Sequence, residues 1–361
     1  MIEKIAILYT GRAGGLNYYN YNLCRAICEY TRPTIIISSQ NVLYEDYSKL
    51  NCNLVHYDTY NNKISFIFNT FFLRNFLKFS DYILSQNFDY IIDTGSMVLG
   101  QLIKKRCLST KFITVIHDTN LKKEYTTRLL ILFRMYSIDY SNSVAFIVLS
   151  EYDKNQLKKL TTKKIIVSVP GFSHAPEYIS KYNHSNKSFL FFGRIEKYKN
   201  IDLLVPAFIN AKKIRPEIRL TIIGSGRINK KTLKLIESEP SIFLLHRWIG
   251  DHEIIEAFKN HGIVILPYTE GPASAVIATA NAYNCLPIAS NLGAFREYVT
   301  DGFDGLLIEP NLMGISESII RISGSPELYN QIINNIATKD YSSRLWKNIA
   351  KKLIENINCV T

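Results

Sequence analysis

The chain has 361 residues, 47% of them hydrophobic, which is long enough for two domains with separate cores. It contains no apolar run of about 18 residues and no signal-peptide pattern at its start, so we expect a cytoplasmic protein without a transmembrane helix. The net charge is +12, and residues 1–172 hold 21 Lys and Arg against 13 Asp and Glu, which suggests an anionic partner for the first half. The six cysteines show no paired Cys or His spacing, so reduced thiols and no metal site are expected.

The first half alternates short apolar runs with helical patterns. Uninterrupted apolar runs are typical of buried parallel strands, and they predict strands at 4–10, 34–38, 89–95, 112–118 and 145–150. Helices are predicted around 15–30, 64–84, 97–106 and 120–138. A Pro-Gly turn within 167–173 closes the set. The alternation predicts a doubly wound α/β domain over residues 1–172.

A second set of elements follows a polar stretch, 173–187, which we interpret as a linker. Apolar runs predict strands at 188–193, 218–226, 242–248, 262–268, 286–290 and 305–310. Helical patterns lie between them, so a second doubly wound domain is predicted over 188–340. The tail, 341–361, has amphipathic spacing and predicts a helix that packs back toward the N-terminal domain.

Three strand ends of the second domain carry residues suited to phosphate, because ligands of doubly wound sheets bind at the carboxyl ends of the strands. Arg194 and Lys199 follow the first strand and would offer a diphosphate a planar fork and a point charge. Gly224 and Gly226 follow the next strand and allow close approach of a ligand to the backbone. Ordinary surface cations and a plain turn are the alternatives.

The third strand end runs from Pro267 through Glu270 into a helix that is predicted to start near Ser274. Free backbone N–H groups of Ser274, Ala275 and Val276 would form an anion site at the helix N-terminus. Glu270 would hydrogen-bond sugar hydroxyls. The alternative is a plain strand-to-helix turn with an exposed Glu.

Taken together, these motifs resemble the family-4 retaining glycosyltransferases of GT-B fold. That family carries Gly-Arg-Leu and, three residues later, Lys-Gly; this chain has Gly193, Arg194 and Lys199 at the matching positions, with Asn200 in place of the glycine. The Gly-x-Gly strand end, the Glu-Gly after Pro-Tyr, and the segment 286–310 match as well. The resemblance implies an α/β protein with two Rossmann-like domains facing each other across a cleft.

The resemblance also points to residues around the nucleotide, and to one departure. The family's second Glu, eight positions after Glu270, normally holds the ribose, and Ala278 stands there instead. Glu297 matches the third family acid and is a candidate replacement, with an ion pair to Arg296 or a nearby cation as the alternative. The nucleobase would lie at the turn of Trp248 and Ile249, where Trp248 either stacks on the base or belongs to the core.

Two family marks lie in the first domain. Gly14 and Gly15 match a Gly-Gly loop near the acceptor and the donor phosphates, with a plain turn as the alternative. His117 and Asp118 match a His-Asp pair at a strand end. There His117 would hydrogen-bond a hydroxyl of the donor sugar and Asp118 would orient the site, unless the pair is structural.

What the resemblance implies is a metal-independent hexosyltransferase with Arg194, Lys199, Glu270 and His117 as its catalytic residues. It would transfer a hexose with retention from a nucleotide sugar, a UDP-sugar in preference to a GDP-sugar. The acceptor would be a lipid-linked oligosaccharide or polysaccharide in cell-surface glycan synthesis, such as O-antigen or capsule. No cofactor beyond the donor is expected, because cations and a helix start can stabilise a leaving diphosphate.

The segment 62–83 combines six Phe with Lys63, Arg74 and Lys78. Apolar residues flanked by cations favour an interfacial helix that binds an anionic membrane surface. This predicts a peripheral location on the inner face of the cell membrane. An aromatic helix packed on its own sheet is the alternative.

Three other functions compete with the transferase. Nucleic-acid binding is suggested by charge alone, and because no RNA-type motif occurs, no nucleic-acid partner is expected. A catalytically inactive GT-B scaffold with a binding or partner role is favoured by Ala278 and Asn200, and opposed by Arg194, Lys199 and Glu270. A nucleotide-sugar epimerase of the same fold would need paired acids that the sequence does not place.

Overall fold

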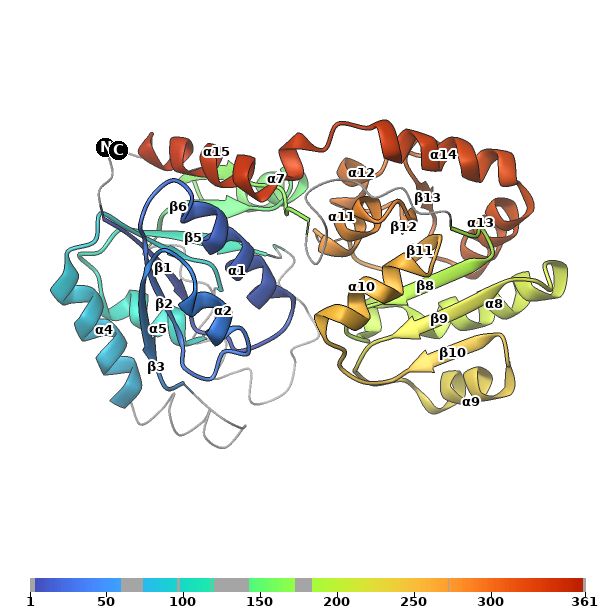
Figure 1. Ribbon diagram of the computed structural model, residues 1–361, viewed down its shortest axis with the longest axis horizontal. Helices are drawn as coiled ribbons and strands as arrows, with labels where there is room; N and C mark the ends of the chain where they lie inside the picture. Colours follow the sequence, from blue (N-terminus) through green and yellow to red (C-terminus); the bar gives the residue numbers. More distant parts are fainter. Residues whose placement is uncertain are drawn as a thin grey trace. The chain divides into compact units, whose positions relative to one another are not determined.

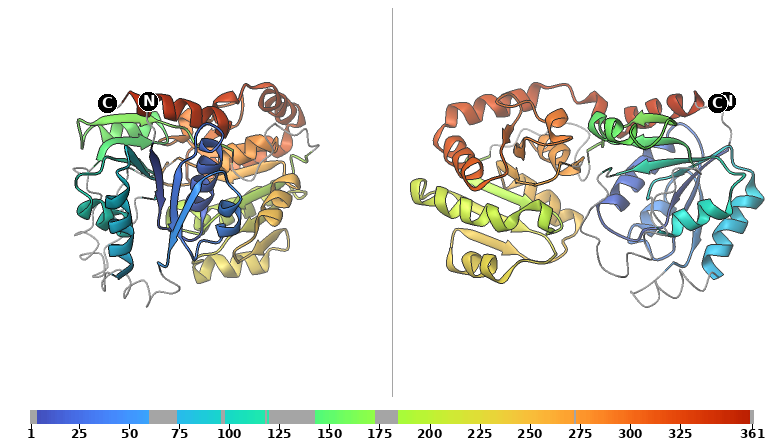
Figure 2. Two further views of the ribbon diagram at one scale, coloured as in Figure 1. Left: turned by 60° about the vertical axis from the view of Figure 1, so that its left-hand side comes forward. Right: turned by 180° about the vertical axis from the view of Figure 1, so that it is seen from behind.

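The computed structural model describes residues 4–59, 74–95, 98–117, 119, 143–172, 184–271 and 273–359. The chain divides into two compact units, one of Met1–Gly171 with Ser343–Thr361 and one of Phe172–Ser342. Each unit is built on one parallel sheet with helices on both of its faces (Figures 1 and 2). The predicted fold class, a two-domain α/β protein with doubly wound sheets, is confirmed.

The first unit has a seven-stranded sheet in the order β3-β2-β1-β4-β5-β6-β7. Its strands are β1 (Ile5–Tyr9), β2 (Thr34–Ser38), β3 (Asn53–Tyr57), β4 (Tyr90–Asp93), β5 (Phe112–Ile116), β6 (Ser143–Val148) and β7 (Lys164–Val167). Its helices are α1 (Gly15–Ile27), α2 (Tyr44–Ser48), α4 (Arg74–Gln86), α5 (Val98–Arg106), α7 (Glu151–Leu157) and α15 (Trp346–Asn358), the last preceded by a 3-10 turn at Ser342–Arg344.

Strands β3 and β7 are the two strands that the sequence analysis missed. They lie at the edges of the sheet, where only one neighbour covers them, and most of their residues are exposed or half-buried. The central strands β1, β2, β4 and β5 are buried along their whole length, which produces the apolar runs visible in the sequence. An edge strand lacks this signal because polar residues are tolerated on it.

The second unit has a six-stranded sheet in the order β10-β9-β8-β11-β12-β13. Its strands are β8 (Ser188–Phe192), β9 (Arg219–Ile223), β10 (Ile242–Leu245), β11 (Ile263–Leu266), β12 (Leu286–Ser290) and β13 (Leu306–Ile308). Its helices are α8 (Ile201–Ile214), α9 (Lys230–Ser238), α10 (Asp251–Lys259), α11 (Ala275–Ala282), α12 (Phe295–Tyr298), α13 (Leu312–Gly324) and α14 (Pro326–Thr338), with a 3-10 turn at Lys197–Lys199.

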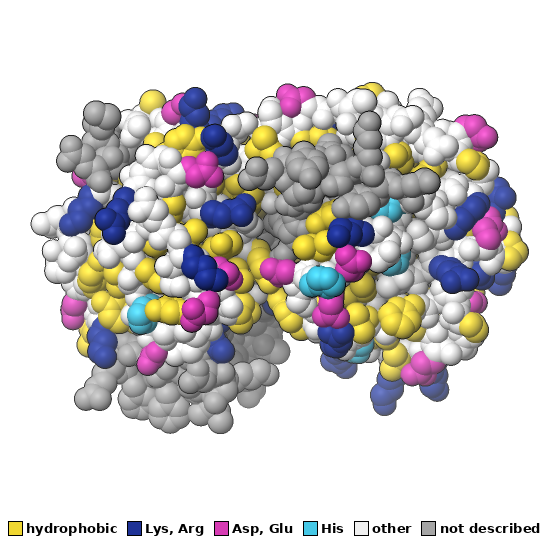
Figure 3. All heavy atoms as spheres, in the orientation of Figure 1, with side chains coloured by type: hydrophobic (Ala, Val, Ile, Leu, Met, Phe, Trp, Pro, Cys, Tyr) yellow, Lys and Arg dark blue, Asp and Glu magenta, His cyan; other side chains and the backbone are white. Residues whose placement is uncertain are grey.

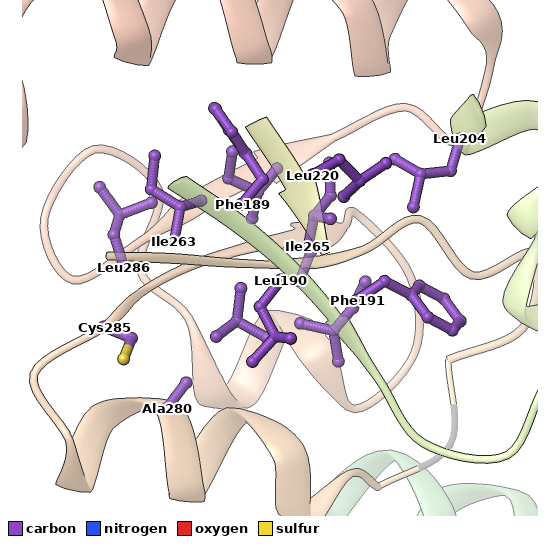
Figure 4. Packing of buried hydrophobic residues seen from close by; sticks show 14 of the residues in the cluster. Phe189, Leu190, Phe191, Leu204, Leu220, Ile263, Ile265, Ala280, Cys285 and Leu286 are labelled. Carbon is purple, nitrogen blue, oxygen red and sulfur yellow. The ribbon is translucent and has the colours of Figure 1, made fainter. Parts of the chain in front are cut away.

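Strand β8 shows how the core of this unit is filled from both faces of the sheet. Successive side chains of a strand point to opposite faces, and Figure 4 shows Phe189 on one face and Leu190 on the other, toward Ala280 of α11. Both side chains are fully buried. Because helices cover both faces, the strand is apolar at consecutive positions, and its carboxyl end is left to carry polar residues.

Helix α15 contains the amphipathic pattern predicted for the chain's tail and packs against α1 of the first unit (Figure 2). The ring of Trp346 meets the ring of Tyr19 edge-on, with 5.4 Å between centroids. A Cβ at Gly171 would stand 2.6 Å from Cε2 of Trp346, so the indole occupies space that any larger residue would need. Tyr30 donates a hydrogen bond to the carbonyl of Lys347 at 3.2 Å.

Helix α4 covers the second half of the segment predicted to bind membranes; residues 62–73 lie outside the described residues. Phe79 is fully buried in the core, and its ring meets that of Tyr57 on β3 at 4.7 Å. Phe79 is therefore unavailable to a membrane, which corrects the prediction for this residue in favour of packing on the sheet. Lys78 is exposed.

Surface charge and helix length both bear on a possible membrane contact. On the face drawn in Figure 3, Lys and Arg side chains are interspersed with Asp and Glu. None of the helices within the described ranges has the length and apolar character that crossing a bilayer requires.

Candidate functional site

The loops at the carboxyl edge of the second sheet are joined by hydrogen bonds from one strand end to the next. After β8 and β9, Gly193 N–H donates to the carbonyl of Ile223 at 3.0 Å, and Ile195 N–H donates to the carbonyl of Ser225 at 2.8 Å. After β11, Thr269 N–H donates to the carbonyl of Tyr198 at 2.7 Å. These bonds bring the predicted phosphate-binding segments of three strands into one platform.

Gly224 and Gly226 lie where the loops after β8 and β9 come too close for a side chain. A Cβ at Gly224 would lie 1.9 Å from the carbonyl oxygen of Gly193, and one at Gly226 would lie 2.1 Å from that of Ile195. The two loops therefore approach each other more closely than side chains permit. The sequence analysis expected these glycines to let a ligand approach; the structure shows that they let a neighbouring loop approach.

Lys199 lies close to both the backbone after β8 and the ring of Tyr268. Its Nζ lies 5.3 Å from the centre of the Tyr268 ring, within cation–π range. A Cβ at Gly193 would lie 2.8 Å from the same nitrogen, so the ammonium group sits close against the backbone after β8. Tyr268 is buried, and burial raises the pKa of its phenol well above the ordinary value. A neutral ring thus supports Lys199 from the end of β11.

Arg194 and Glu270 lie on the same edge of the sheet. Nη1 of Arg194 is 3.5 Å from Oε1 of Glu196, and the arginine side chain is 70% exposed. An exposed ion pair of this kind contributes little to stability and leaves the guanidinium accessible to a ligand. Glu270 follows Tyr268 by two residues and is half-buried.

Helix α11 begins at Ala275, close to the predicted start. Ser274 is its N-cap, and its Oγ accepts from the N–H of Val276 at 3.3 Å. The N–H of Val276 therefore already has a partner inside the chain, which corrects the expectation that it is free. Ala278, where the resembling family has its second Glu, is 3% exposed inside this helix.

Trp248 and Ile249 follow β10 and differ from each other in exposure. Trp248 is 55% exposed, which rules out the core alternative for its indole. Ile249 is buried, so its side chain belongs to the core and only its backbone is left for a ligand. His246 binds the carbonyl of Gly226 through Nε2 at 2.7 Å and so ties this turn to the loop after β9.

Glu297 lies on α12 and is exposed. Its neighbour Arg296 donates from Nε to Oδ1 of Asn291 at 2.8 Å and from Nη2 to the carbonyl of the same residue at 2.8 Å. The loop that carries α12 is joined to the loop after β11, because Ala294 N–H donates to the carbonyl of Gly271 at 2.9 Å.

In the first unit, Gly14 and Gly15 form the start of α1. Gly14 has φ +97°, a conformation that residues with a side chain rarely adopt. Apart from the adjoining residues and the backbone of α1 itself, no described atom lies within 4 Å of the place where a Cβ would stand on either glycine. The Gly-Gly turn is therefore open among the described residues, as a ligand-binding loop requires.

His117 follows β5 and is half-buried; its predicted companion Asp118 lies outside the described residues. Its Nε2 is 2.7 Å from the carbonyl oxygen of Thr94, at the end of the neighbouring strand β4. The ring of Tyr19 meets the imidazole edge-on at 4.9 Å. Burial lowers the pKa of His117, an effect that the Thr94 carbonyl and Asp93 partly oppose, so the neutral ring is favoured.

Several residues that contact the predicted site residues were not identified from the sequence. Tyr268 supports Lys199, Glu196 pairs with Arg194, and Thr94 holds His117. The sequence does show a polar or aromatic residue shortly after each of these buried strands. It does not show which other residue that side chain or backbone group contacts. In the described part of the chain, no group of three or more His, Cys, Asp or Glu is arranged to hold a metal ion.

Known proteins resemble this chain in sequence. Residues 175–339 match the family model of glycosyl transferases group 1. The lipopolysaccharide 1,2-N-acetylglucosaminetransferase of Salmonella typhimurium is 23% identical over 356 residues, which cover 90% of this chain and 89% of that protein. An uncharacterized glycosyltransferase of Methanocaldococcus jannaschii is 28% identical over 255 residues, 68% of this chain and 67% of that protein.

Solved structures resemble it in fold. Anabaena HepE, solved in complex with UDP and glucose, has a TM-score of 0.78 at 14% identity, over 99% of this chain and 100% of that one. The fold is therefore GT-B. The family model, the relatives and the fold together support a glycosyltransferase of the GT-B fold, that is, a transferase.

Proposed function

We propose that this protein is a retaining hexosyltransferase of family 4. Its donor is a nucleotide sugar, a UDP-sugar in preference to a GDP-sugar, and its acceptor is a lipid-linked oligosaccharide or polysaccharide. The proposal draws support from HepE, whose solved complex contains UDP and glucose, and from the Salmonella relative, which is named for lipopolysaccharide. The product would belong to cell-surface glycan synthesis, O-antigen or capsule.

The observation that carries the proposal is the position of Lys199. Its ammonium group stands between the backbone at Gly193 and the ring of Tyr268, at the carboxyl edge of the sheet in the unit that the family model matches. Arg194 lies on the same loop, and α11 starts at the neighbouring strand end. Two cations and a helix N-terminus at one edge suit the two phosphates of a nucleotide sugar.

The chemistry needs charge stabilisation more than a base. When the bond between the sugar and the diphosphate breaks, negative charge develops on the leaving phosphate, and Arg194 and Lys199 would stabilise it. We propose that this transfer requires no metal ion. Retention is a proposal from family resemblance: the leaving phosphate takes the proton of the acceptor hydroxyl on the same face of the sugar. His117 would accept a hydrogen bond from a sugar hydroxyl, and Glu270 and Glu297 would contact the sugar and the ribose.

The acceptor places the protein at a membrane in this proposal. A lipid-linked glycan is carried in the bilayer, so an enzyme that extends it works peripherally, on the inner face of the cell membrane. The charge of the first half, 21 Lys and Arg against 13 Asp and Glu, is suited to anionic lipids. Segment 62–83 is the proposed contact.

The donor can be tested without knowing the acceptor. Thermal stability is measured with UDP, GDP, ADP and CMP, with and without a chelator, on wild type and on Lys199→Ala. A bound nucleotide raises stability according to its concentration relative to Kd. We expect stabilisation by UDP that persists in chelator and that Lys199→Ala abolishes. Lys197→Ala is the matched control, because Lys197 lies two residues away on the same 3-10 turn and is exposed.

Turnover is then measured with the nucleotide sugar identified in this way. Removing Lys199 or Arg194 should lower kcat by about 100-fold or more, the usual effect of losing one group that stabilises transition-state charge. The anomeric configuration of the product, read by NMR, tests retention. Stabilisation by none of the nucleotides would favour the inactive-scaffold alternative, and equal activity of both alanine variants and wild type would refute the assignment of these cations.

A further inference from the structure

A buried ion pair lies in the first unit, at the carboxyl end of β4. Nζ of Lys104, on α5, is 2.9 Å from Oδ2 of Asp93, and the two side chains are 0% and 2% exposed. Neither residue has a part in the chemistry proposed above. Moving two charges out of water carries a desolvation cost that their attraction often fails to exceed, so a pair of this kind is weak evidence for a purely stabilising role.

The pair belongs to a hydrogen-bond network that spans several elements. Lys104 also donates to Oγ1 of Thr114 on β5 at 3.0 Å, and that oxygen is 2.6 Å from Oγ of Ser143 on β6. Asp93 accepts through Oδ1 from the N–H of Gly95 at 3.3 Å. Lys104 therefore joins α5 to the end of β4 through the ion pair and to the middle of β5 through Thr114, and these two strands are neighbours in the sheet.

The hydrogen bond between His117 and the carbonyl of Thr94 joins the ends of the same two strands. Thr94, which provides the carbonyl, directly follows Asp93, and His117 comes three residues after Thr114. Thr94 is held on its other side, where its Oγ1 donates to Oδ1 of Asn20 at 2.5 Å. Thr94 and His117, the two residues of this hydrogen bond, thus both lie close in sequence to residues of the ion-pair network.

This contact determines which nitrogen of His117 carries the proton. A backbone carbonyl can only accept, so the nitrogen 2.7 Å from it, Nε2, must donate. In the neutral ring the other nitrogen, Nδ1, is then an acceptor with a lone pair. A hydroxyl is the chemical group that such an acceptor suits.

We propose that Asp93 and Lys104 are positioning residues for His117. Their pair, with the bond from Lys104 to Thr114, holds β4 and β5 so that the Thr94 carbonyl selects the Nε2-protonated tautomer, and Nδ1 is presented as acceptor to a hydroxyl of the donor sugar. The hydrogen bonds that Lys104 donates to Thr114 and that Asp93 accepts from Gly95 fix the direction of the two side chains, whereas an apolar pair of similar volume would make neither bond. The role at the sugar rests on the proposed function; the selection of the tautomer does not.

The tautomer is tested by NMR on the full chain with 15N-labelled histidine, near neutral pH. The variant Asp93→Asn with Lys104→Met removes both charges together and leaves neither buried alone. We expect His117 to show a single Nε2-protonated form in wild type and a mixture of tautomers in the variant. Loss of one set of signals in His117→Gln assigns the residue.

Two histidines of the second unit serve as internal controls. His261 binds the carbonyl of Ala257 through Nδ1 at 2.6 Å, and therefore carries its proton on Nδ1. His184 binds the carbonyl of Tyr283 through Nε2 at 2.8 Å, and carries it on Nε2. The spectrum thus contains both tautomers as references, and neither should change in the variant.

Activity gives the second readout. Because only the Nε2-protonated fraction can accept from the donor, kcat/KM should fall in proportion to that fraction in the double variant, by at most about five- to tenfold, the effect of losing one neutral hydrogen bond. The matched control is Asp304→Asn with Lys339→Met, which removes an ion pair of the second unit whose carboxylate is also buried. That control should keep both kcat/KM and the His117 tautomer. Thermal unfolding verifies that each variant is folded.

A folded double variant in which His117 keeps a single Nε2-protonated form would overturn the proposal. A mixture of tautomers with unchanged kcat/KM would refute the role at the sugar. A mixture in a chain that transfers no sugar even as wild type would support positioning and refute the proposed function instead. Should the double variant not fold, Asp93→Asn with Lys104→Gln, which also removes both charges and fills the site with polar side chains, tests the same expectation.

Discussion

At the scale of single residues, Asn200 shows how a departure from a family pattern can be structurally neutral. It stands where the resembling family has glycine, and its φ of 61° and ψ of 37° place it in the left-handed region. It ends the 3-10 turn that carries Lys199 and precedes α8. Asparagine is one of the few residues with a side chain that are enriched in this conformation. Asn200 is therefore no argument for an inactive scaffold.

Substitutions at Asn200 test this account. Asn200→Gly should change the free energy of unfolding by less than about 0.5 kcal/mol, whereas Asn200→Ala should cost about 1 kcal/mol, because alanine pays the left-handed strain without a compensating group. Urea titration measures both. Asn284, with φ 56° at the end of α11, is a matched site where the same ranking is expected. An alanine variant as stable as wild type would contradict the explanation.

At the scale of elements, α4 shows that one amphipathic pattern can serve two surfaces. Phe79 and Ile83 face the core of the first unit, while Lys78 and Asp81 are exposed. The described half of the segment therefore behaves as a helix packed on its own sheet. A membrane contact of residues 62–83 would involve the phenylalanines that precede α4 in the sequence, and the exposed Lys78.

Vesicle flotation tests the membrane proposal. The full chain should float with vesicles that contain anionic lipid, remain unbound to neutral ones, and lose binding as salt is raised. Lys63→Glu with Lys78→Glu should weaken binding, by about 1 kcal/mol for each cation removed. Lys158→Glu with Lys159→Glu, exposed cations at the end of α7, is the control for charge alone. Equal binding to both kinds of vesicle, or none, would contradict an electrostatic membrane contact.

At the scale of the whole molecule, half-buried histidines link stability to pH. His184 and His261 lie in the second unit, and burial lowers the pKa of both, with the charge of His184 lowering that of His261 further. A lowered pKa means that the folded state binds protons less readily than the unfolded chain. The contribution of these two histidines to the free energy of unfolding is therefore fully present above the unfolded pKa of about 6.5. It decreases as the pH falls below that value.

Calorimetric unfolding between neutral pH and about pH 5 measures this effect. We expect Tm to fall with pH in wild type and to fall less steeply in His261→Gln, which cannot be protonated in this range. His252→Gln, at an exposed position on α10, is the matched control for replacing a histidine by glutamine. A His261→Gln variant with an unchanged slope would show that other groups cause the loss of stability.

The sequence by itself determined the fold class and the edge of the second sheet on which Arg194, Lys199 and Glu270 lie. It could do so because strands covered on both faces must be apolar along their length, and because parallel strands place all their carboxyl ends at one edge. The edge strands β3 and β7 were not predicted, because an exposed strand can carry polar residues and so lacks an apolar run. Only the tertiary structure decided which residues meet: Tyr268 beneath Lys199, Gly193 against Gly224, Asp93 with Lys104, and the Thr94 carbonyl on His117. Such contacts join residues far apart in the chain, and they follow from strand order and loop packing, which no local pattern of residues encodes.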